Sequence, residues 1–251
     1  MSALLKLENI KLVYHTKKNE TVALENLNLE INEGEFVSIV GPSGCGKTTI
    51  LSLIAGILKP TEGNIYQNDT KIKGINTKAS YMFQRDNLLE WLNIYKNVML
   101  GPSLCHNKSK ETQDKVLNML NKYGLGDFIK SYPNELSGGM RQRVALIRTL
   151  ATNPYCLLLD EPFSALDYQT RLVVQDNVLE IIKNEHKTAI LVTHDIGEAV
   201  AMSDKVIILT KRPACVKKEI KLNFNKNLTP LERRKDPKFN SYFNEIWEEL
   251  E

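Results

Sequence analysis

The stretch that decides the fold of this chain is Gly41-Pro42-Ser43-Gly44-Cys45-Gly46-Lys47-Thr48. It reads G-x-x-x-x-G-K-[ST], the pattern of a phosphate-binding loop. An apolar, β-rich run over 36–40 precedes the loop, and an apolar run that ends at Gly56 follows it. The loop therefore stands between a predicted buried strand and a predicted helix. This context disfavours a glycine-rich turn that matches by chance.

Each part of the loop can contribute to holding a phosphate. Glycines let the backbone turn its N–H groups inward around an anion, and the N-terminus of the following helix adds partial positive charge. Lys47 can bridge the outer phosphates, and the Thr48 hydroxyl can ligate Mg²⁺. The loop predicts a nucleoside triphosphate as ligand, and the rest of the chain must indicate what is done with it.

Composition excludes several classes of protein. The chain has 251 residues and is 42% hydrophobic, which suffices for one sizeable core, or for a core with a smaller subdomain. With 33 basic and 30 acidic residues the net charge is +3, too balanced to indicate a nucleic-acid binder. No apolar run approaches the ~18–20 residues of a membrane-spanning helix, so we expect any membrane role to act through a partner. Four scattered cysteines are expected to be free thiols: Cys45, Cys105, Cys156 and Cys215.

Two further predicted strands end in polar residues. The run 155–159 leads into Asp160 and Glu161, and the run 188–193 leads into His194. The carboxyl ends of strands form the ligand-binding edge of α/β proteins. There Asp160 could hold Mg²⁺, Glu161 could act on an attacking water, and His194 could contact a terminal phosphate. The alternatives are a polar loop and a structural histidine, and the phosphate loop in the same chain disfavours the first.

The roles of two residues stay open at this level. Tyr14 could stack on a base, although an ordinary half-exposed strand tyrosine is the favoured interpretation. Gln84 directly follows a predicted strand over 79–83. It could touch a ligand at the strand end or be a surface glutamine.

From about 91 to 150 the pattern becomes helical, which predicts a helical subdomain inserted into an α/β domain. Ser137 is a predicted N-cap within this section, and Gly138 and Gly139 follow it. Two glycines at a helix start allow close approach to an anion, so the stretch predicts a second phosphate site. A plain capped helix is the alternative, and it is less attractive because glycine weakens a first helical turn.

The tail is predicted to end in an amphipathic helix that starts at Pro237, with Asp236 as its N-cap. Aromatic and aliphatic residues recur on one face of it, which we expect to pack on the helix's own domain. Binding of a partner or a membrane surface is the minority interpretation. The basic run 233–235 is expected to be a solvated face.

Together these motifs resemble those of the ATP-binding cassette (ABC) family, in the family's order over roughly residues 4–222. The motifs that carry the resemblance are the phosphate loop 41–48, Gln84, the signature-like stretch 136–140, the acidic strand end 156–161, the turn 164–167 and His194. In detail they are most similar to ATPase subunits of nitrate/sulfonate/taurine importers. Leu89-Glu90-Trp91 stands where that subfamily usually has Leu-Pro-Trp, and Ile147-Arg148-Thr149 where it usually has Ala-Arg-Ala. Neither departure touches the chemistry.

The resemblance implies an α/β fold, a P-loop NTPase core with an N-terminal antiparallel β layer and an inserted all-helical subdomain. The core would span 1–90 and 151–225, the subdomain 91–150, and a C-terminal amphipathic helix 226–251. The implied activity is ATP hydrolysis that drives uptake of a small solute (nitrate-, sulfonate- or taurine-like) through a partner permease. The implied location is the cytoplasmic face of the membrane. The alternatives are a soluble ABC ATPase acting on nucleic acid or ribosomes, which usually carries two cassettes or a coiled-coil insertion, and a small-molecule P-loop kinase.

The resemblance also implies a head-to-tail homodimer that sandwiches two ATP molecules, each held by the phosphate loop of one subunit and by residues 137–139 of the other. The expected ATP contacts are Tyr14, Gly41, Pro42, Ser43, Gly44, Cys45, Gly46, Lys47, Thr48, Thr49, Ser137, Gly138, Gly139 and Asp167. The expected catalytic residues are Lys47, Gln84, Glu161 and His194, and the expected Mg²⁺ ligands are Thr48, Gln84 and Asp160. Expected partners are integral membrane permease subunits, contacted through Gln84 and the segment around Trp91, and indirectly a solute-binding protein. No nucleic acid is expected.

Cys45 carries a separate hypothesis. It lies in the phosphate loop near a helix N-terminus, where thiol pKa values tend to fall. On this basis we expect alkylation of the thiol to inhibit the ATPase, and bound ATP to protect it.

Overall fold

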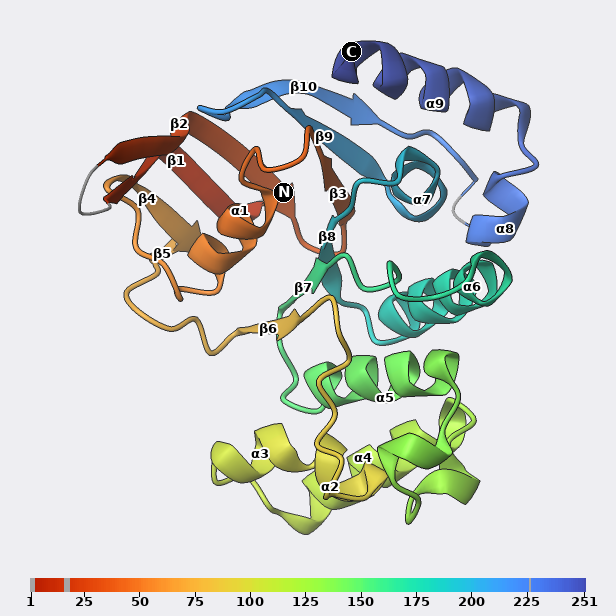
Figure 1. Ribbon diagram of the computed structural model, residues 1–251. Coiled ribbons are helices and arrows are strands. Elements are labelled where there is room, and N and C mark those ends of the chain that lie inside the picture. The colour runs from red at the N-terminus through yellow and green to blue at the C-terminus, as the bar shows by residue number, and fades with distance from the viewer. Residues whose placement is uncertain (1–2, 16–18, 226) are drawn as a thin grey trace.

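The computed structural model describes residues 3–15, 19–225 and 227–251, and its named strands form two sheets (Figure 1). The smaller sheet is antiparallel, in the order β2-β1-β4-β5. Its strands are β1 (Ala3–His15), β2 (Glu20–Asn32), β4 (Glu62–Gln67) and β5 (Thr70–Lys71). The larger sheet has the order β10-β9-β3-β8-β7-β6. Its strands are β3 (Phe36–Val40), β6 (Ala79–Met82), β7 (Cys156–Asp160), β8 (Thr188–Val192), β9 (Lys205–Leu209) and β10 (Val216–Lys221).

The centre of the larger sheet is parallel. β3 pairs with β8 and β9, and β7 pairs with β6 and β8, all in parallel. Every residue of β3, β7 and β8 is buried, which explains why these strands are continuous apolar runs with no alternation. Because the strands are parallel, the segments that follow them meet at one edge of the sheet.

Each face of the larger sheet is covered by a different layer. Leu157 and Leu159 of β7 pack into a cluster with the helices α5 (Gly138–Leu150) and α6 (Tyr168–Asn184). Cys156 and Leu158 point to the other face, toward α1 (Lys47–Ile54) and the antiparallel sheet. The period of two along a strand therefore divides the core into two layers.

All described elements between 91 and 150 are helical, and Figure 1 shows them at one end of the molecule. They are α2 (Ile94–Val98), α3 (Leu100–Leu104), α4 (Lys110–Lys122), α5, and the 3₁₀ turns η1 (Gly126–Phe128) and η2 (Pro133–Glu135). The buried amide of Asn97 donates to the carbonyl of Leu92 (2.8 Å) and accepts from the N–H of Leu89 (2.8 Å). This pair of bonds holds the loop that leads into the helices.

The tail packs on the domain. α8 (Pro230–Arg233) lies against α6 and α7 (Ile196–Met202), and α9 (Pro237–Leu250) lies against α7 and β9. The expectation that the basic run 233–235 is solvated is wrong for Arg233, which is 2% exposed. Its guanidinium donates to the carbonyl of Ser203 (2.7 Å) and lies over the ring of Phe224. Among the described helices, none combines the length and the apolar character needed to cross a bilayer.

Candidate functional site

A pocket of about 550 Å³ opens where the phosphate loop meets the carboxyl edge of the larger sheet. It is lined by Ser43, Gly44, Gly46, Lys47, Thr48, Thr49, Glu161, His194 and Arg212. The loop follows β3, Glu161 follows β7, and His194 comes two residues after β8. The parallel register therefore brings together groups that are more than 100 residues apart in the chain.

The phosphate loop is built around its lysine. Lys47 donates from Nζ to the carbonyl oxygens of Gly41 (2.8 Å) and Pro42 (3.2 Å). Its side chain is buried across the loop. Gly44 has φ +73° and Gly46 φ +122°, angles that glycine adopts without a Cβ clash. The backbone thus curves around the lysine, whose charge faces the space where a phosphate chain would lie.

A hydroxyl and a carboxylate meet beside the loop. The Thr48 hydroxyl donates to Asp160 Oδ1 (3.0 Å), and the Tyr81 hydroxyl donates to Asp160 Oδ2 (2.8 Å). Burial and the neighbouring carboxylate raise the pKa of Tyr81, so the phenol stays a hydrogen-bond donor. The third expected Mg²⁺ ligand, Gln84, is turned away and donates to the hydroxyl of Ser164 (3.2 Å). Two of the three expected ligands are therefore adjacent here.

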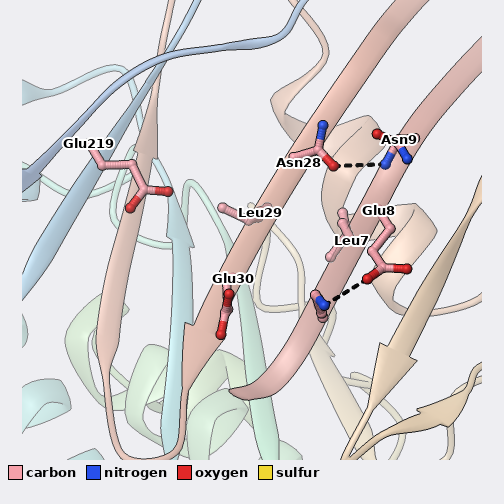
Figure 2. A pocket seen from close by; sticks show the side chains of 8 residues that line it. Leu7, Glu8, Asn9, Asn28, Leu29, Glu30 and Glu219 are labelled. Carbon is pink, nitrogen blue, oxygen red and sulfur yellow. Dashed lines mark hydrogen bonds and ion pairs between the residues drawn. The ribbon is translucent and has the colours of Figure 1, made fainter. Parts of the chain in front are cut away.

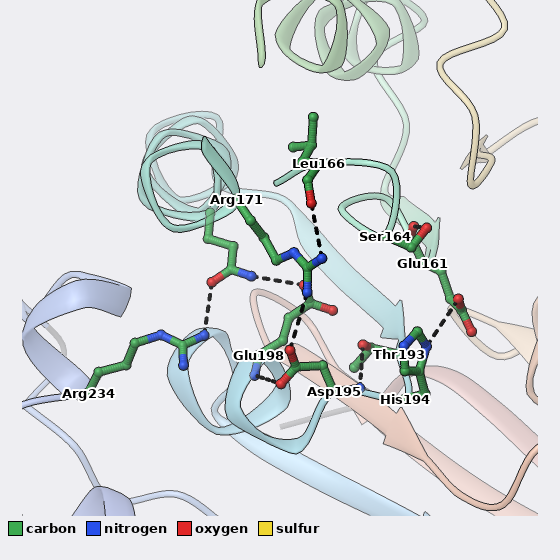
Figure 3. Close-up of polar contacts among 10 residues, drawn as sticks. Glu161, Ser164, Leu166, Arg171, Thr193, His194, Asp195, Glu198 and Arg234 are labelled. Atoms are coloured by element: carbon green, nitrogen blue, oxygen red, sulfur yellow. Dashed lines mark hydrogen bonds and ion pairs between the residues drawn. The ribbon is translucent and has the colours of Figure 1, made fainter. Parts of the chain in front are cut away.

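Glu161 and His194 form a direct pair, seen in Figure 3, with 3.2 Å between Glu161 Oε2 and His194 Nδ1. Glu161 has φ +46°, a left-handed conformation that costs an L-residue roughly 1–2 kcal/mol. Strain of this kind persists where the surrounding structure enforces it, and it clusters at functional sites. The imidazole is 66% exposed, so it can reach a ligand in the pocket.

Tyr14 lies at the rim of the same region. Its hydroxyl is 3.1 Å from the Thr49 hydroxyl at the start of α1. The ring is 38% exposed. A half-exposed aromatic face next to a phosphate loop is a possible platform for a base.

The expected second phosphate site lies elsewhere in the chain. Ser137 caps α5 and accepts from the N–H of Met140 (3.3 Å), but residues 137–139 do not line the pocket. Asp167 is also outside it and caps α6 through the N–H of Thr170 (3.0 Å). A Cβ on Gly139 would lie 3.0 Å from a methyl carbon of Val174. Close packing against Val174 therefore favours glycine at position 139, a reason that the sequence alone does not reveal.

The environment of Cys45 contradicts the hypothesis of a reactive thiol. Its side chain is 2% exposed and belongs to the core beneath the loop. Burial raises the pKa of the Cys45 thiol, so the helix N-terminus does not decide its ionisation. Any contact of this residue with a phosphate would come from its backbone.

Two residues of this region were missed. Arg212 lines the pocket and donates to the carbonyl of Gly44. It follows the apolar strand β9, so the strand-end rule that selected His194 could have found it. Tyr81 reaches Asp160 because β6 and β7 are neighbours, with Tyr81 opposite Leu158. The sequence around Tyr81 contains no pattern that predicts this register.

A second hollow, of about 440 Å³, lies on the antiparallel sheet (Figure 2). It is lined by Lys6, Leu7, Glu8, Asn9, Asn28, Leu29, Glu30 and Glu219. Lys6 and Glu8 form an exposed ion pair within it (2.7 Å). It contains none of the expected site residues.

Sequence comparison identifies the relatives of the chain. The sequence model of the ABC transporter family matches residues 24–164. An uncharacterized ABC transporter ATP-binding protein of Bacillus subtilis, YtlC, is 42% identical, covering 98% of this chain and 95% of that protein. A taurine import ATP-binding protein of Ruegeria pomeroyi, TauB, is 42% identical (88% and 82%). The nitrate transport protein NasD of Klebsiella oxytoca is 40% identical (88% and 85%).

Comparison with solved structures identifies the same family as the sequence relatives. The dimeric post-hydrolysis state of the ATP-binding cassette MJ0796, bound to ADP and Pi, superposes with a TM-score of 0.73 at 37% identity, covering 88% of this chain and 100% of that chain. The protein cbiO1 from Clostridium perfringens, part of an ABC transporter complex, gives a TM-score of 0.77 at 27% identity (87% and 88%). The expected α/β P-loop fold is confirmed. The chain belongs to the ABC transporter family, as an ATP-hydrolysing cassette.

Proposed function

We propose that the chain is the ATPase subunit of an importer for a small solute of the nitrate, sulfonate or taurine class. The observation that carries the proposal is the convergence of the phosphate loop, Glu161 and His194 on one pocket. The name of the relative TauB, a taurine import protein, supports the direction of transport. The names of TauB and of the nitrate transport protein NasD support the class of solute. Neither name points to a nucleic acid, so the alternative of a soluble ATPase acting on nucleic acid or ribosomes receives no support.

Within the pocket each group has a distinct role. Lys47 and the N–H groups of the loop hold the triphosphate, and Tyr14 stacks on the adenine. Glu161 orients the attacking water and accepts its proton, while His194 donates a hydrogen bond to the terminal phosphate. Water attacks the γ-phosphorus, the bond to the bridging oxygen breaks, and ADP leaves with that oxygen.

The donor set at Thr48 and Asp160 fits Mg²⁺, because a hydroxyl and a carboxylate are the hard oxygen ligands that this cation prefers. When bound, the cation would neutralise charge on the phosphate oxygens. The Tyr81 hydroxyl holds the second oxygen of the Asp160 carboxylate, so that Oδ1 beside Thr48 would be available to the cation. Gln84 would join this set only after leaving Ser164.

The site is completed by a second copy of the chain. Residues 137–139 form a capped helix start with two glycines, yet they lie outside the pocket of their own subunit. In a head-to-tail homodimer they would close over the phosphates held by the partner. The dimeric state of the related cassette MJ0796 supports this arrangement.

We assign the core to 1–90 and 151–225, the helical subdomain to 91–150, and the C-terminal helix to 226–251. The subdomain presents Trp91, which is 73% exposed, beside the loop that carries Gln84. We infer that this surface contacts the permease at the cytoplasmic face of the membrane, and that the permease in turn receives solute from a binding protein. An exposed tryptophan is typical of such interaction surfaces.

The test uses Glu161→Gln, which keeps the size of the side chain but cannot accept a proton. We expect ATP to bind, hydrolysis to slow by at least ~100-fold, and an ATP-bound dimer to accumulate on size-exclusion chromatography. Glu180→Gln, on the exposed face of α6, is the matched control and should behave as wild type. Normal turnover in Glu161→Gln would remove Glu161 from this role. Co-purification with a polytopic membrane protein tests the importer assignment separately.

A further inference from the structure

Arg171 joins two segments that flank the Glu161–His194 pair, without lining the pocket (Figure 3). It lies in the first turn of α6. Its Nη2 donates to the carbonyl of Leu166 (3.0 Å), and its Nη1 is 3.5 Å from Asp195 Oδ2. One of these partners lies in the turn 164–167 and the other directly follows His194. Arg171 therefore links the backbone after Glu161 to the backbone after His194.

These contacts complete a closed ring of interactions. The Ser164 hydroxyl donates to the carbonyl of Glu161 (3.0 Å), and the Glu161 carboxylate contacts His194 (3.2 Å). Asp195, the next residue after His194, forms an ion pair with Arg171. Arg171 in turn donates to the carbonyl of Leu166, in the same turn as Ser164, which closes the ring. Arg171 is therefore connected to the Glu161–His194 pair on both sides, through Ser164 and Leu166 and through Asp195.

Asp195 is held from both sides. Its Oδ1 accepts from the N–H of Glu198 (3.0 Å) and caps α7, while its Oδ2 faces Arg171. The Arg171 and Asp195 side chains are 25% and 37% exposed, so the ion pair contributes little to stability. What the contact supplies is a fixed separation between the start of α6 and the start of α7.

We propose that Arg171 is a positioning residue for ATP hydrolysis, which keeps His194 aligned with Glu161 by tying the turn 164–167 to Asp195. This inference rests on the roles proposed above for Glu161 and His194. Since Arg171 does not line the pocket, its loss should slow turnover and leave the affinity for ATP unchanged. A misplacement of about 1 Å can cost up to ~100-fold in rate.

Two variants test the tie from its two ends. Arg171→Ala removes both contacts, and Asp195→Asn removes the ion pair while keeping a good helix cap. In the full chain we expect kcat to fall about 10- to 100-fold in both, with the KM for ATP within about twofold of wild type. Lys122→Ala is the control, since it removes the Lys122–Glu185 ion pair, which has the same 3.5 Å separation, and it should have wild-type kcat.

A double-mutant cycle with His194→Ala separates positioning from a general structural defect. If Arg171 acts through His194, Arg171→Ala should lower the single-turnover rate of His194→Ala by less than about twofold. If the rate losses of Arg171→Ala and His194→Ala multiply in the double variant, the two residues act independently and the proposal is overturned. Wild-type kcat in Asp195→Asn would overturn it as well. Urea unfolding checks that each variant is folded. If Arg171→Ala does not fold, the kcat of Asp195→Asn tests the proposal instead. Wild-type turnover of His194→Ala would instead refute the proposed role of His194 itself, and the positioning role with it.

Discussion

The buried carboxyl of Glu198 makes the stability of this protein depend on pH. Glu198 lies in α7, is 3% exposed, and accepts a hydrogen bond from the amide of Gln175 (2.8 Å). Burial raises its pKa to about 7, against an ordinary value of 4.5. Between these two values the folded chain keeps the proton that the unfolded chain has lost. The stability that the protonated group provides is therefore fully present below about pH 4.5 and is lost as the pH rises through about 7.

The size of the effect follows from the two pKa values. At about 1.4 kcal/mol for each tenfold change in an equilibrium constant, the full difference between 4.5 and about 7 corresponds to about 3–4 kcal/mol. Most of it, about 2–3 kcal/mol, falls between pH 5 and pH 8. Above about pH 8 the carboxyl is ionised in both states, so Glu198 adds no further slope.

The assay compares wild type with Glu198→Gln, which stays neutral at every pH. Urea unfolding at pH 5, 6, 7 and 8 gives the free energy of unfolding of each protein. Groups that the two proteins share cancel in the difference. We expect wild type to lose about 2–3 kcal/mol more than Glu198→Gln between pH 5 and pH 8. The exposed control Glu180→Gln should follow wild type, and parallel pH profiles of wild type and Glu198→Gln would refute the reasoning.

Three further predictions concern the pocket. Arg212→Ala removes a cation from the rim of the phosphate loop, and we expect the KM for ATP to rise about 10-fold with a smaller change in kcat; an unchanged KM would show that the guanidinium does not face the nucleotide. Tyr81→Phe removes the donor to Asp160 Oδ2, so we expect a higher Mg²⁺ requirement in a titration of ATPase activity, by about 10-fold, whereas an unshifted titration would contradict that role. Because burial raises the pKa of the Cys45 thiol, we expect its alkylation by iodoacetamide at pH 7.5, followed by mass spectrometry, to be slower than that of exposed Cys105; faster labelling of Cys45 would restore the hypothesis of a reactive thiol.

Much of the site could be predicted because it depends on a simple topological rule. Asp160, Glu161 and His194 are polar residues at the ends of apolar runs, and the parallel pairing of β3, β7 and β8 brings such ends together. Arg212 also follows a parallel strand, β9, but Thr210 and Lys211 stand between it and the strand end. This separation makes Arg212 harder to recognise from the sequence than Glu161 or His194. Strand ends are therefore the most informative positions in a chain of this kind.

What could not be predicted depends on contacts between distant elements. Tyr81 reaches Asp160 through the register of β6 and β7, and Arg171 of α6 reaches Asp195 at the N-cap of α7 through a side-chain ion pair. The interpretation of Arg233 as solvated was wrong because its carbonyl partners and the ring of Phe224 come from other segments. Charge and local periodicity do not contain this information.

The central claim is that each ATP site is shared between two copies of the chain, and mixing two inactive variants tests it directly. Lys47→Ala disables the phosphate loop, and Ser137→Arg blocks the exposed helix start; each variant alone should be inactive. Mixed in equal amounts, they should recover about a quarter of the wild-type ATPase rate, because about half of the dimers are then mixed and each mixed dimer holds one intact site. If the mixture stays as inactive as its components, the two motifs do not meet across a dimer interface.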